Sequence, residues 1–170
     1  MSNIYSFLNT NKIAYERFDH PEVFTCEQAN ELCPDMPGQS IKNLFLYDKR
    51  TEQHFLVIVP SDKQVDLKKL KILLEVSNLS FASEERLTKY LGVKPGFVTI
   101  LALINDTTHS VKIIFDVQLK NQSLRCHPLI NTATLVISCD NIKKFLSITD
   151  HAYDFLQIPE RNATISTINS

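Results

Sequence analysis

A lysine and an asparagine in one apolar stretch are the first side chains that could carry chemistry. In the run IKNLFL at 41–46, the two-residue period of a strand places Lys42 on the same face as Leu44 and Leu46, and Asn43 on the opposite face. A lysine on the apolar face of a central strand needs an anionic partner or an anionic ligand. A lysine at a strand end can also reach water along its own methylene chain, and the pattern alone favours this plainer interpretation.

A histidine with hydrogen-bonding neighbours follows much later, in the run CHPLINTAT at 126–134. His127 could orient a ligand or transfer protons near neutral pH, because an ordinary histidine titrates there. Asn131 and Thr132 could serve the same site, but the plainer interpretation is that they satisfy the backbone of a turn. Nucleophilic catalysis by Cys126 with His127 is not favoured, because neighbours on a strand point to opposite faces.

Two weaker candidates lie between these motifs. The loop 92–99 contains Gly92, Pro95 and Gly96, so its backbone N–H groups could approach a ligand closely, as they could in any connecting turn. Asp106 could be a catalytic carboxylate, although a turn that uses its side chain is favoured. Motifs for phosphate-binding loops, dinucleotide binding, zinc proteases and serine hydrolases are absent from the sequence. The residues indicate an enzyme or a binding module with a lysine, asparagine and histidine pocket.

Composition excludes several classes of protein. The 170 residues carry a net charge of −1 and are 44% hydrophobic, which is typical of one globular domain and untypical of a protein that coats nucleic acid. The four cysteines have no metal-ligand spacing and are expected to be reduced thiols, so no metal site is predicted. No apolar run approaches 18 residues and the first residues lack signal-peptide features, so we expect a soluble cytoplasmic protein without membrane contact.

Hydrophobic periodicity and capping residues predict the elements that would position these side chains. Helices are expected at 3–11, 25–32, 67–74, 83–92 and 141–148. The expected N-cap residues of the last four are Thr25, Asp66, Ser83 and Asp140. Strands are expected at 15–19, 41–48, 54–60, 79–82, 98–104, 111–115 and 134–138, with a hairpin joining the second and third. This order predicts an α+β (mixed α/β) fold with a mixed central sheet and surrounding helices. We expect a single domain over residues 1–158, followed by a polar C-terminal tail at 159–170.

Four sequence blocks carry a resemblance to a known family. They are HPEVFT at 20–25, KNLFL at 42–46, LSFASE at 79–84 and HPLINTAT at 127–134. In this order and spacing they resemble the free-standing prolyl-tRNA editing proteins of the YbaK/ProX superfamily, and most closely their alanine-specific branch (ProXp-ala or PrdX). The resemblance extends over residues 3–156 and implies the single editing domain of that family.

The resemblance implies a trans-editing aminoacyl-tRNA deacylase. Its substrate would be alanine esterified to tRNA(Pro), and prolyl-tRNA(Pro) would be spared. A synthetase pocket built for proline cannot reject the smaller alanine strongly, since one methylene is worth only about 1–3 kcal/mol, so a second and smaller pocket removes the error. The implied partners are the acceptor end of tRNA(Pro) carrying alanine and, as a second candidate, prolyl-tRNA synthetase.

The functional residues of the family can be carried onto this chain one by one. The essential lysine falls on Lys42, beside Asn43, where it would hold the 3′ end of the tRNA and could stabilise charge that develops at the ester. The family histidine falls on His127, which would help to position the aminoacyl-adenosine, and Asn131 and Thr132 complete its loop. A ribose hydroxyl of the tRNA would help to activate water, so no metal, cofactor or protein nucleophile is expected.

One position departs from the family pattern. The GxxxP loop of the family corresponds to Gly96-Phe97-Val98-Thr99-Ile100, with Ile100 in place of proline. Gly96 and Thr99 are the residues of this loop expected to bind the substrate. Isoleucine frees the backbone and restores an N–H group, so amino-acid selectivity is the property most exposed to change.

Two other functions remain open at this point. A deacylase with a roomier pocket would act on cysteine or serine, and a module that had lost catalysis would only bind tRNA or a synthetase. Because the net charge is near zero, tRNA must be held by a local patch, for which the candidates are Lys42, Lys63, Lys68, Lys69 and Lys71. A solvated helix face is the plainer explanation for the last three.

Overall fold

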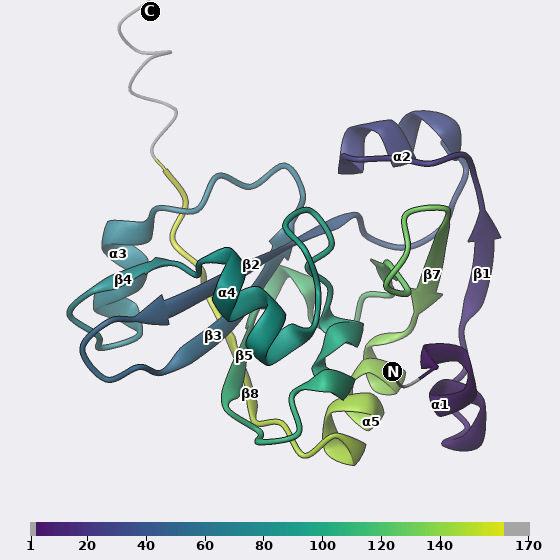
Figure 1. The fold of residues 1–170 in the computed structure, drawn as a ribbon. Coiled ribbons are helices and arrows are strands. Elements are labelled where there is room, and N and C mark those ends of the chain that lie inside the picture. The colour runs from purple at the N-terminus through teal and green to yellow at the C-terminus, as the bar shows by residue number, and fades with distance from the viewer. Residues whose placement is uncertain (1–2, 162–170) are drawn as a thin grey trace, which may run out of the picture.

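Two β-sheets organise the part of the chain that the computed structural model describes, residues 3–161 (Figure 1). The larger sheet has the strand order β4-β2-β3-β5-β8, with antiparallel pairs around β2 and parallel pairs on both sides of β5. The smaller, antiparallel sheet has the order β1-β7-β6. The strands are β1 (Glu16–Asp19), β2 (Ile41–Asp48), β3 (His54–Pro60), β4 (Leu79–Phe81), β5 (Val111–Asp116), β6 (Leu124–Cys126), β7 (Ala133–Ile137) and β8 (Tyr153–Leu156). The predicted α+β class with a mixed central sheet is confirmed.

Short helices cover both faces of the larger sheet. They are α1 (Ile4–Thr10), α2 (Cys26–Leu32), α3 (Leu67–Leu73), α4 (Glu84–Arg86), the π-helical turn η1 (Leu87–Leu91), the 3-10 segments η2 (Ile100–Asn105) and η3 (Val117–Leu119), and α5 (Cys139–Ile148). One face packs against α1, η1, η2 and α5, and the other packs against α3. Among residues 3–161, no helix combines the length and apolar character that crossing a bilayer demands.

The alternation predicted for β2 is present in the core. Phe45 belongs to the larger apolar cluster, on the α5 side of the sheet, whereas Leu44 and Leu46 pack in the smaller cluster on the α3 side. Lys42 and Asn43 therefore start on opposite faces of the sheet, because successive residues of a strand alternate. The hairpin of β2 with β3 is confirmed, with Ile41 opposite Pro60 and Tyr47 opposite His54.

Most predicted helix caps are also confirmed. The side chains of Thr25, Asp66 and Ser83 accept hydrogen bonds from backbone N–H groups in the first turns of α2, α3 and α4. Gly92 ends η1 with φ of 64°, the left-handed conformation expected for a glycine at that position. The last helix is the exception, because Ser138 rather than Asp140 caps α5 and the helix starts at Cys139.

One predicted strand was wrong, and two observed strands were not predicted. The apolar run at 98–104 is not a strand but contains η2, which is largely buried, and a buried run has no periodicity that separates helix from strand. The strands β6 and β8 were not predicted. Each has only three or four residues, so a two-residue alternation has little length in which to appear.

The first residues of the predicted tail take part in the fold. The N–H of Asp66 donates to the carbonyl of Pro159 at 2.9 Å, and the N–H of Arg161 donates to the carbonyl of Gln64 at 2.7 Å. A bridge between Val65 and Glu160 lies between these two bonds. Residues 159–161 therefore lie along the segment before α3 and are not frayed, and the rest of the predicted tail, 162–170, lies outside the described residues.

Candidate active site

A small cavity of about 170 Å³ opens beside the first half of β2. It is lined by Val23, Phe24, Thr25, Ile41, Lys42, Asn43, Gly96, Phe97, Val98, His127, Ile130 and Asn131. Five of the seven site residues predicted from the sequence are among them, namely Lys42, Asn43, Gly96, His127 and Asn131. The fold thus brings together the segment before α2, the start of β2, the loop before η2 and the loop before β7.

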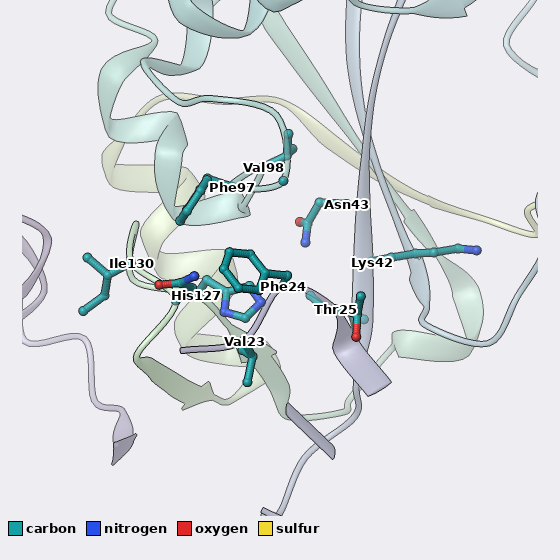
Figure 2. A pocket seen from close by; sticks show the side chains of 12 residues that line it. Val23, Phe24, Thr25, Lys42, Asn43, Phe97, Val98, His127 and Ile130 are labelled. Atoms are coloured by element: carbon teal, nitrogen blue, oxygen red, sulfur yellow. The ribbon is translucent and has the colours of Figure 1, made fainter. Parts of the chain in front are cut away.

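Two side chains present unpaired polar atoms at this cavity. The amide oxygen Oδ1 of Asn43 and the ring nitrogen Nδ1 of His127 are buried and have no hydrogen-bond partner among the described residues. Figure 2 shows Asn43 pointing from β2 toward the side on which His127 and Phe97 lie. A buried polar atom without a partner costs about 1–3 kcal/mol, so two of them at one cavity are candidates for contact with a ligand.

The histidine at the cavity is held in its neutral form. Burial lowers the pKa of His127 below its ordinary value of 6.5, and the nearby His20 lowers it further, while a backbone hydrogen bond to Ala133 opposes the shift. Because the backbone bond to Ala133 raises the pKa, as a bond donated by the ring does, we infer that the ring nitrogen facing Ala133 carries the proton and that Nδ1 is left as an acceptor. The cavity therefore offers two acceptors, Nδ1 of His127 and Oδ1 of Asn43, which suit a cationic or N–H-bearing ligand.

Lys42 lines the cavity but its side chain leaves it. Figure 2 shows Lys42 extending from β2 in the direction opposite to Asn43, away from His127. The side chain also lines a second, larger groove on the α3 side of the sheet, together with Leu44. The strand alternation thus places the lysine between the two spaces, in the wall of each.

Two predicted site residues do not line the cavity. Thr99 is buried, and its hydroxyl donates to the backbone carbonyl of His127 at 2.9 Å and accepts from the N–H of Leu101. The carbonyl of Thr132 accepts from the N–H of His20 at 3.0 Å. Thr99 therefore holds the backbone of His127 in place without lining the cavity, and Thr132 holds the start of the segment that begins at His20.

The segment 20–25 closes one side of the cavity. The ring of His20 bonds to the hydroxyl of Thr134 and to the carbonyl of Pro21, both at 2.9 Å. The carbonyl of Asn131 accepts from the N–H of Val23 at 3.1 Å. Sequence reasoning did not identify Val23 or Phe24 as site residues, although both lie in the first resemblance block, because no local pattern shows what a loop side chain faces.

The loop before η2 explains the position where the family has proline. Ile100 is the first residue of η2, with Thr99 as its cap, and proline is favoured there because the first N–H of a helix needs no partner. The side chain of Ile100 is fully buried and is not among the residues that line the cavity. Gly96 has φ of 87° and open space where a Cβ would stand, so the backbone conformation rather than crowding favours glycine.

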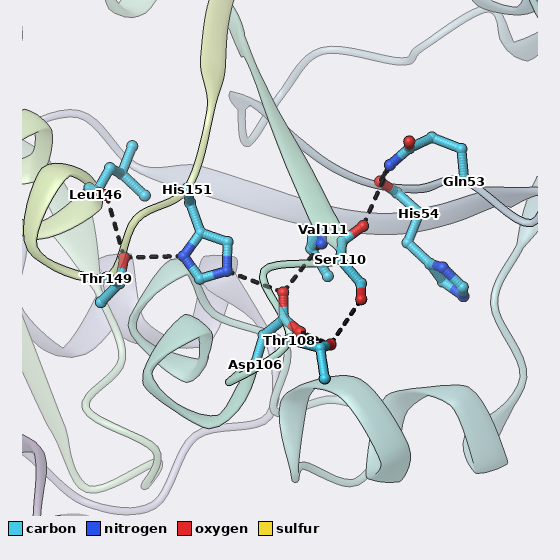
Figure 3. Close-up of polar contacts among 9 residues, drawn as sticks. All are labelled: Gln53, His54, Asp106, Thr108, Ser110, Val111, Leu146, Thr149 and His151. Carbon is cyan, nitrogen blue, oxygen red and sulfur yellow. Dashed lines mark hydrogen bonds and ion pairs between the residues drawn. The ribbon is translucent and has the colours of Figure 1, made fainter.

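Two other candidates lie away from the cavity. Asp106 accepts from the N–H of Val111, from Thr108 and from Nε2 of His151, so its carboxylate is engaged in the core (Figure 3). Cys126 is buried, and burial raises the pKa of its thiol to about 12, so it carries no thiolate at neutral pH. Within residues 3–161, no cluster of three or more histidine, cysteine or carboxylate side chains could hold a metal ion.

Residues 20–145 match the aminoacyl-tRNA editing domain family, and this span contains every residue that lines the cavity. The chain belongs to this family. Two relatives are similar over most of their length. One, named prolyl-tRNA editing protein ProX, from Acetoanaerobium sticklandii, is 34% identical over 152 residues, which are 89% of this chain and 93% of that protein. The other, prolyl-tRNA synthetase associated domain-containing protein 1 from Danio rerio, is 38% identical over 148 residues, or 85% of this chain and 80% of its own.

A solved structure shares the fold. A candidate trans-editing enzyme for prolyl tRNA synthetase superposes with a TM-score of 0.70, covering 94% of this chain and 96% of its own at 17% identity. The family match and these relatives confirm the YbaK/ProX assignment and the enzyme class, an aminoacyl-tRNA hydrolase.

Proposed function

We propose that this protein is a trans-editing deacylase that hydrolyses alanine from mischarged Ala-tRNA(Pro) in the cytoplasm and spares Pro-tRNA(Pro). The observation that carries the proposal is the pair of unpaired acceptors, Oδ1 of Asn43 and Nδ1 of His127, at one small cavity. An aminoacyl ester carries an α-ammonium group, whose N–H donors would satisfy both atoms.

The size of the cavity supports a small amino acid. Its volume of about 170 Å³ is well below the roughly 300–1,000 Å³ of sites that enclose larger ligands. Bulky side chains form much of its wall, including Val23, Phe97, Val98 and Ile130. We expect this wall to admit the methyl group of alanine and to exclude the ring of proline by steric contact.

The reaction is the hydrolysis of an ester. Water adds to the carbonyl carbon, the bond from that carbon to the ribose oxygen breaks, and a proton passes to the ribose oxygen. Alanine and a tRNA with a free 3′-terminal hydroxyl result. Asn43 and His127 would fix the α-ammonium and so hold the carbonyl in place, and a ribose hydroxyl of the tRNA would help to orient the water.

Lys42 would bind the tRNA rather than the amino acid. Its side chain points away from His127. Of the two expected roles of Lys42, holding the 3′ end of the tRNA and stabilising charge at the ester, this geometry favours the first, in which the ammonium group attracts the negative phosphates.

Asn131 and Thr132 would support the site through the backbone bonds that hold segment 20–25. A prolyl-tRNA synthetase is a further candidate partner, because the Danio rerio relative is named for association with one.

The test compares Ala-tRNA(Pro) and Pro-tRNA(Pro) with the purified protein and with Lys42→Ala. We expect rapid loss of alanine and retention of proline with the unaltered protein. In the variant we expect a fall of roughly a hundredfold while the fold survives, because a 3′ end that is no longer held misplaces the ester. Lys49→Ala is the matched control, because Lys49 is an exposed lysine just beyond the far end of β2.

Other outcomes would contradict the proposal in distinct ways. Faster hydrolysis of Cys-tRNA or Ser-tRNA would replace alanine by another amino acid. Binding of tRNA with no hydrolysis of any aminoacyl ester would indicate a module without catalysis. A fully active Lys42→Ala variant would remove Lys42 from the site.

A further inference from the structure

A larger groove, of about 690 Å³, lies on the α3 side of the sheet and shares Lys42 with the cavity. It is lined by Lys42, Leu44, Gln64, Val65, Asp66, Leu67, Lys68, Phe81 and Arg161. Its residues come from β2, the segment before α3, the start of α3, β4 and the last described residue of the chain. Among them, only Lys42 also belongs to the cavity.

The groove and the cavity meet at an uncovered strand edge. On the side of β2 away from β3, strand β4 pairs only with Leu46–Asp48. No other strand within residues 3–161 pairs with this side of β2, so no strand covers the edge at residues 42–44. A ligand whose small end enters the cavity beside Asn43 can therefore continue past this edge into the groove beside Lys42.

The groove combines positive charge with exposed apolar surface. Lys42, Lys68 and Arg161 make no ion pair with any described residue. The one carboxylate, Asp66, caps α3 by accepting from the N–H of Lys69, so part of its charge is engaged by the helix. Phe81 is 58% exposed, which is unusual for a phenylalanine and leaves its ring free for a ligand.

This combination is the one that binds single-stranded nucleic acid. Cations along a groove hold successive phosphates, and an exposed aromatic ring stacks on a base. The cavity is too small to take more than the aminoacyl group, so the nucleotides that carry it must lie outside. The groove is the neighbouring space that offers both kinds of contact.

We propose that this groove holds the single-stranded 3′ end of the tRNA, with phosphates on Lys42, Lys68 and Arg161 and a base stacked on Phe81. The proposal rests on the proposed function for its substrate, and it adds the path of the RNA strand. It also corrects the basic patch expected from the sequence, because Lys63 is buried against Asp116 at 2.5 Å and cannot contact RNA. Of the three lysines of α3, only Lys68 lines the groove.

The test measures binding of a short single-stranded RNA that ends in CCA and carries no amino acid. Binding is followed by fluorescence anisotropy at several salt concentrations. We expect Phe81→Ala to weaken binding by about five- to a hundredfold through loss of stacking. Lys68→Ala should also weaken it, and should reduce the slope of log K against log salt by about 0.7, the value for one phosphate contact to a single strand. Lys69→Ala, on the same helix but outside the groove, should bind as the unaltered protein does.

A second measurement separates this proposal from the proposed function. Phe81→Ala and Lys68→Ala should lower kcat/KM for Ala-tRNA(Pro) through KM. Lys68→Ala should leave hydrolysis of alanyl-adenosine unchanged, because this substrate has no phosphate. If both variants bind the RNA like the unaltered protein, or if a blunt RNA duplex binds as tightly, the groove assignment is wrong whatever the deacylase does. If binding depends on the groove and no ester is hydrolysed, the groove stands and the proposed function fails.

Discussion

Two histidines of this protein, the half-buried His127 and the buried His151, have opposite surroundings. His127, at the cavity, leaves Nδ1 without a partner among the described residues. His151, in the core near α5, has partners for both ring nitrogens, Thr149 at Nδ1 and Asp106 at Nε2, each at 2.9 Å (Figure 3). The Asp106 and His127 regions have the same sequence pattern, because each has a titratable group in a polar turn beside an apolar run.

This difference indicates which of the two regions has hydrogen-bonding groups available to a ligand. The polar groups around Asp106 satisfy one another, because the carboxylate accepts from Val111, Thr108 and His151 within a closed network. Such a network fixes the loop before β5 and needs nothing from outside. At the cavity, the unpaired atoms carry a cost that a ligand with hydrogen-bond donors would remove. We therefore infer that the first region serves stability, and the proposed function assigns the second to binding.

The largest expected effect tests the stabilising region. Asp106→Ala would leave His151 and the N–H of Val111 buried without their acceptor, so we expect the free energy of unfolding to fall by about 3–5 kcal/mol. Activity per folded molecule should be retained. Chemical denaturation measures the loss, and Asp154→Ala is the control, because its ion pair with Lys112 is exposed and contributes about 1 kcal/mol or less. Equal losses in the two variants would contradict the buried network.

A smaller effect is expected at the cavity, and on activity rather than stability. His127→Ala removes one acceptor for the α-ammonium, so kcat/KM for Ala-tRNA(Pro) should fall roughly ten- to a hundredfold, or about 1.4–2.7 kcal/mol. Its free energy of unfolding should barely change. The matched substitution His151→Ala should do the reverse, with lost stability and retained turnover. An unaltered rate in His127→Ala would leave it a turn residue.

The smallest expected effects separate the two regions by pH. The pKa of folded His127 lies below 6.5, so the folded state binds fewer protons than the unfolded state, and stability from this group declines as pH falls through 6.5. Deacylation should decline on further acidification, as pH passes the folded pKa and Nδ1 gains a proton. Hydrogen bonds hold the pKa of Asp106 below 3.8 despite its burial, so its contribution persists above that value and is lost only in stronger acid.

Parallel measurements of enzyme-dependent deacylation and of thermal unfolding against pH check this order. Activity should decline at a pH at which the Asp106 network is still intact. Simultaneous loss of activity and structure would show that the two regions titrate as one.

The elements nearest the site were largely predictable because their signals are local. The alternation of apolar residues in β2 is enough to place Lys42 and Asn43 on opposite faces, since a strand has a period of two whatever packs against it. The caps Thr25, Asp66 and Ser83 were predictable for the same reason. The run at 98–104 was not, because a buried helix and a buried strand have the same composition.

The sequence by itself determined the α+β class, the family, and the residue types that gather at the cavity. Only the tertiary structure decided that Nδ1 of His127 and Oδ1 of Asn43 stay unpaired while Asp106 is satisfied. It also decided that Thr99 supports His127 from behind, that Lys63 is buried, and that Phe81 faces an open groove. The physical reason is that periodicity and capping act between neighbours in sequence, whereas hydrogen-bond satisfaction depends on groups many residues away that folding alone brings together.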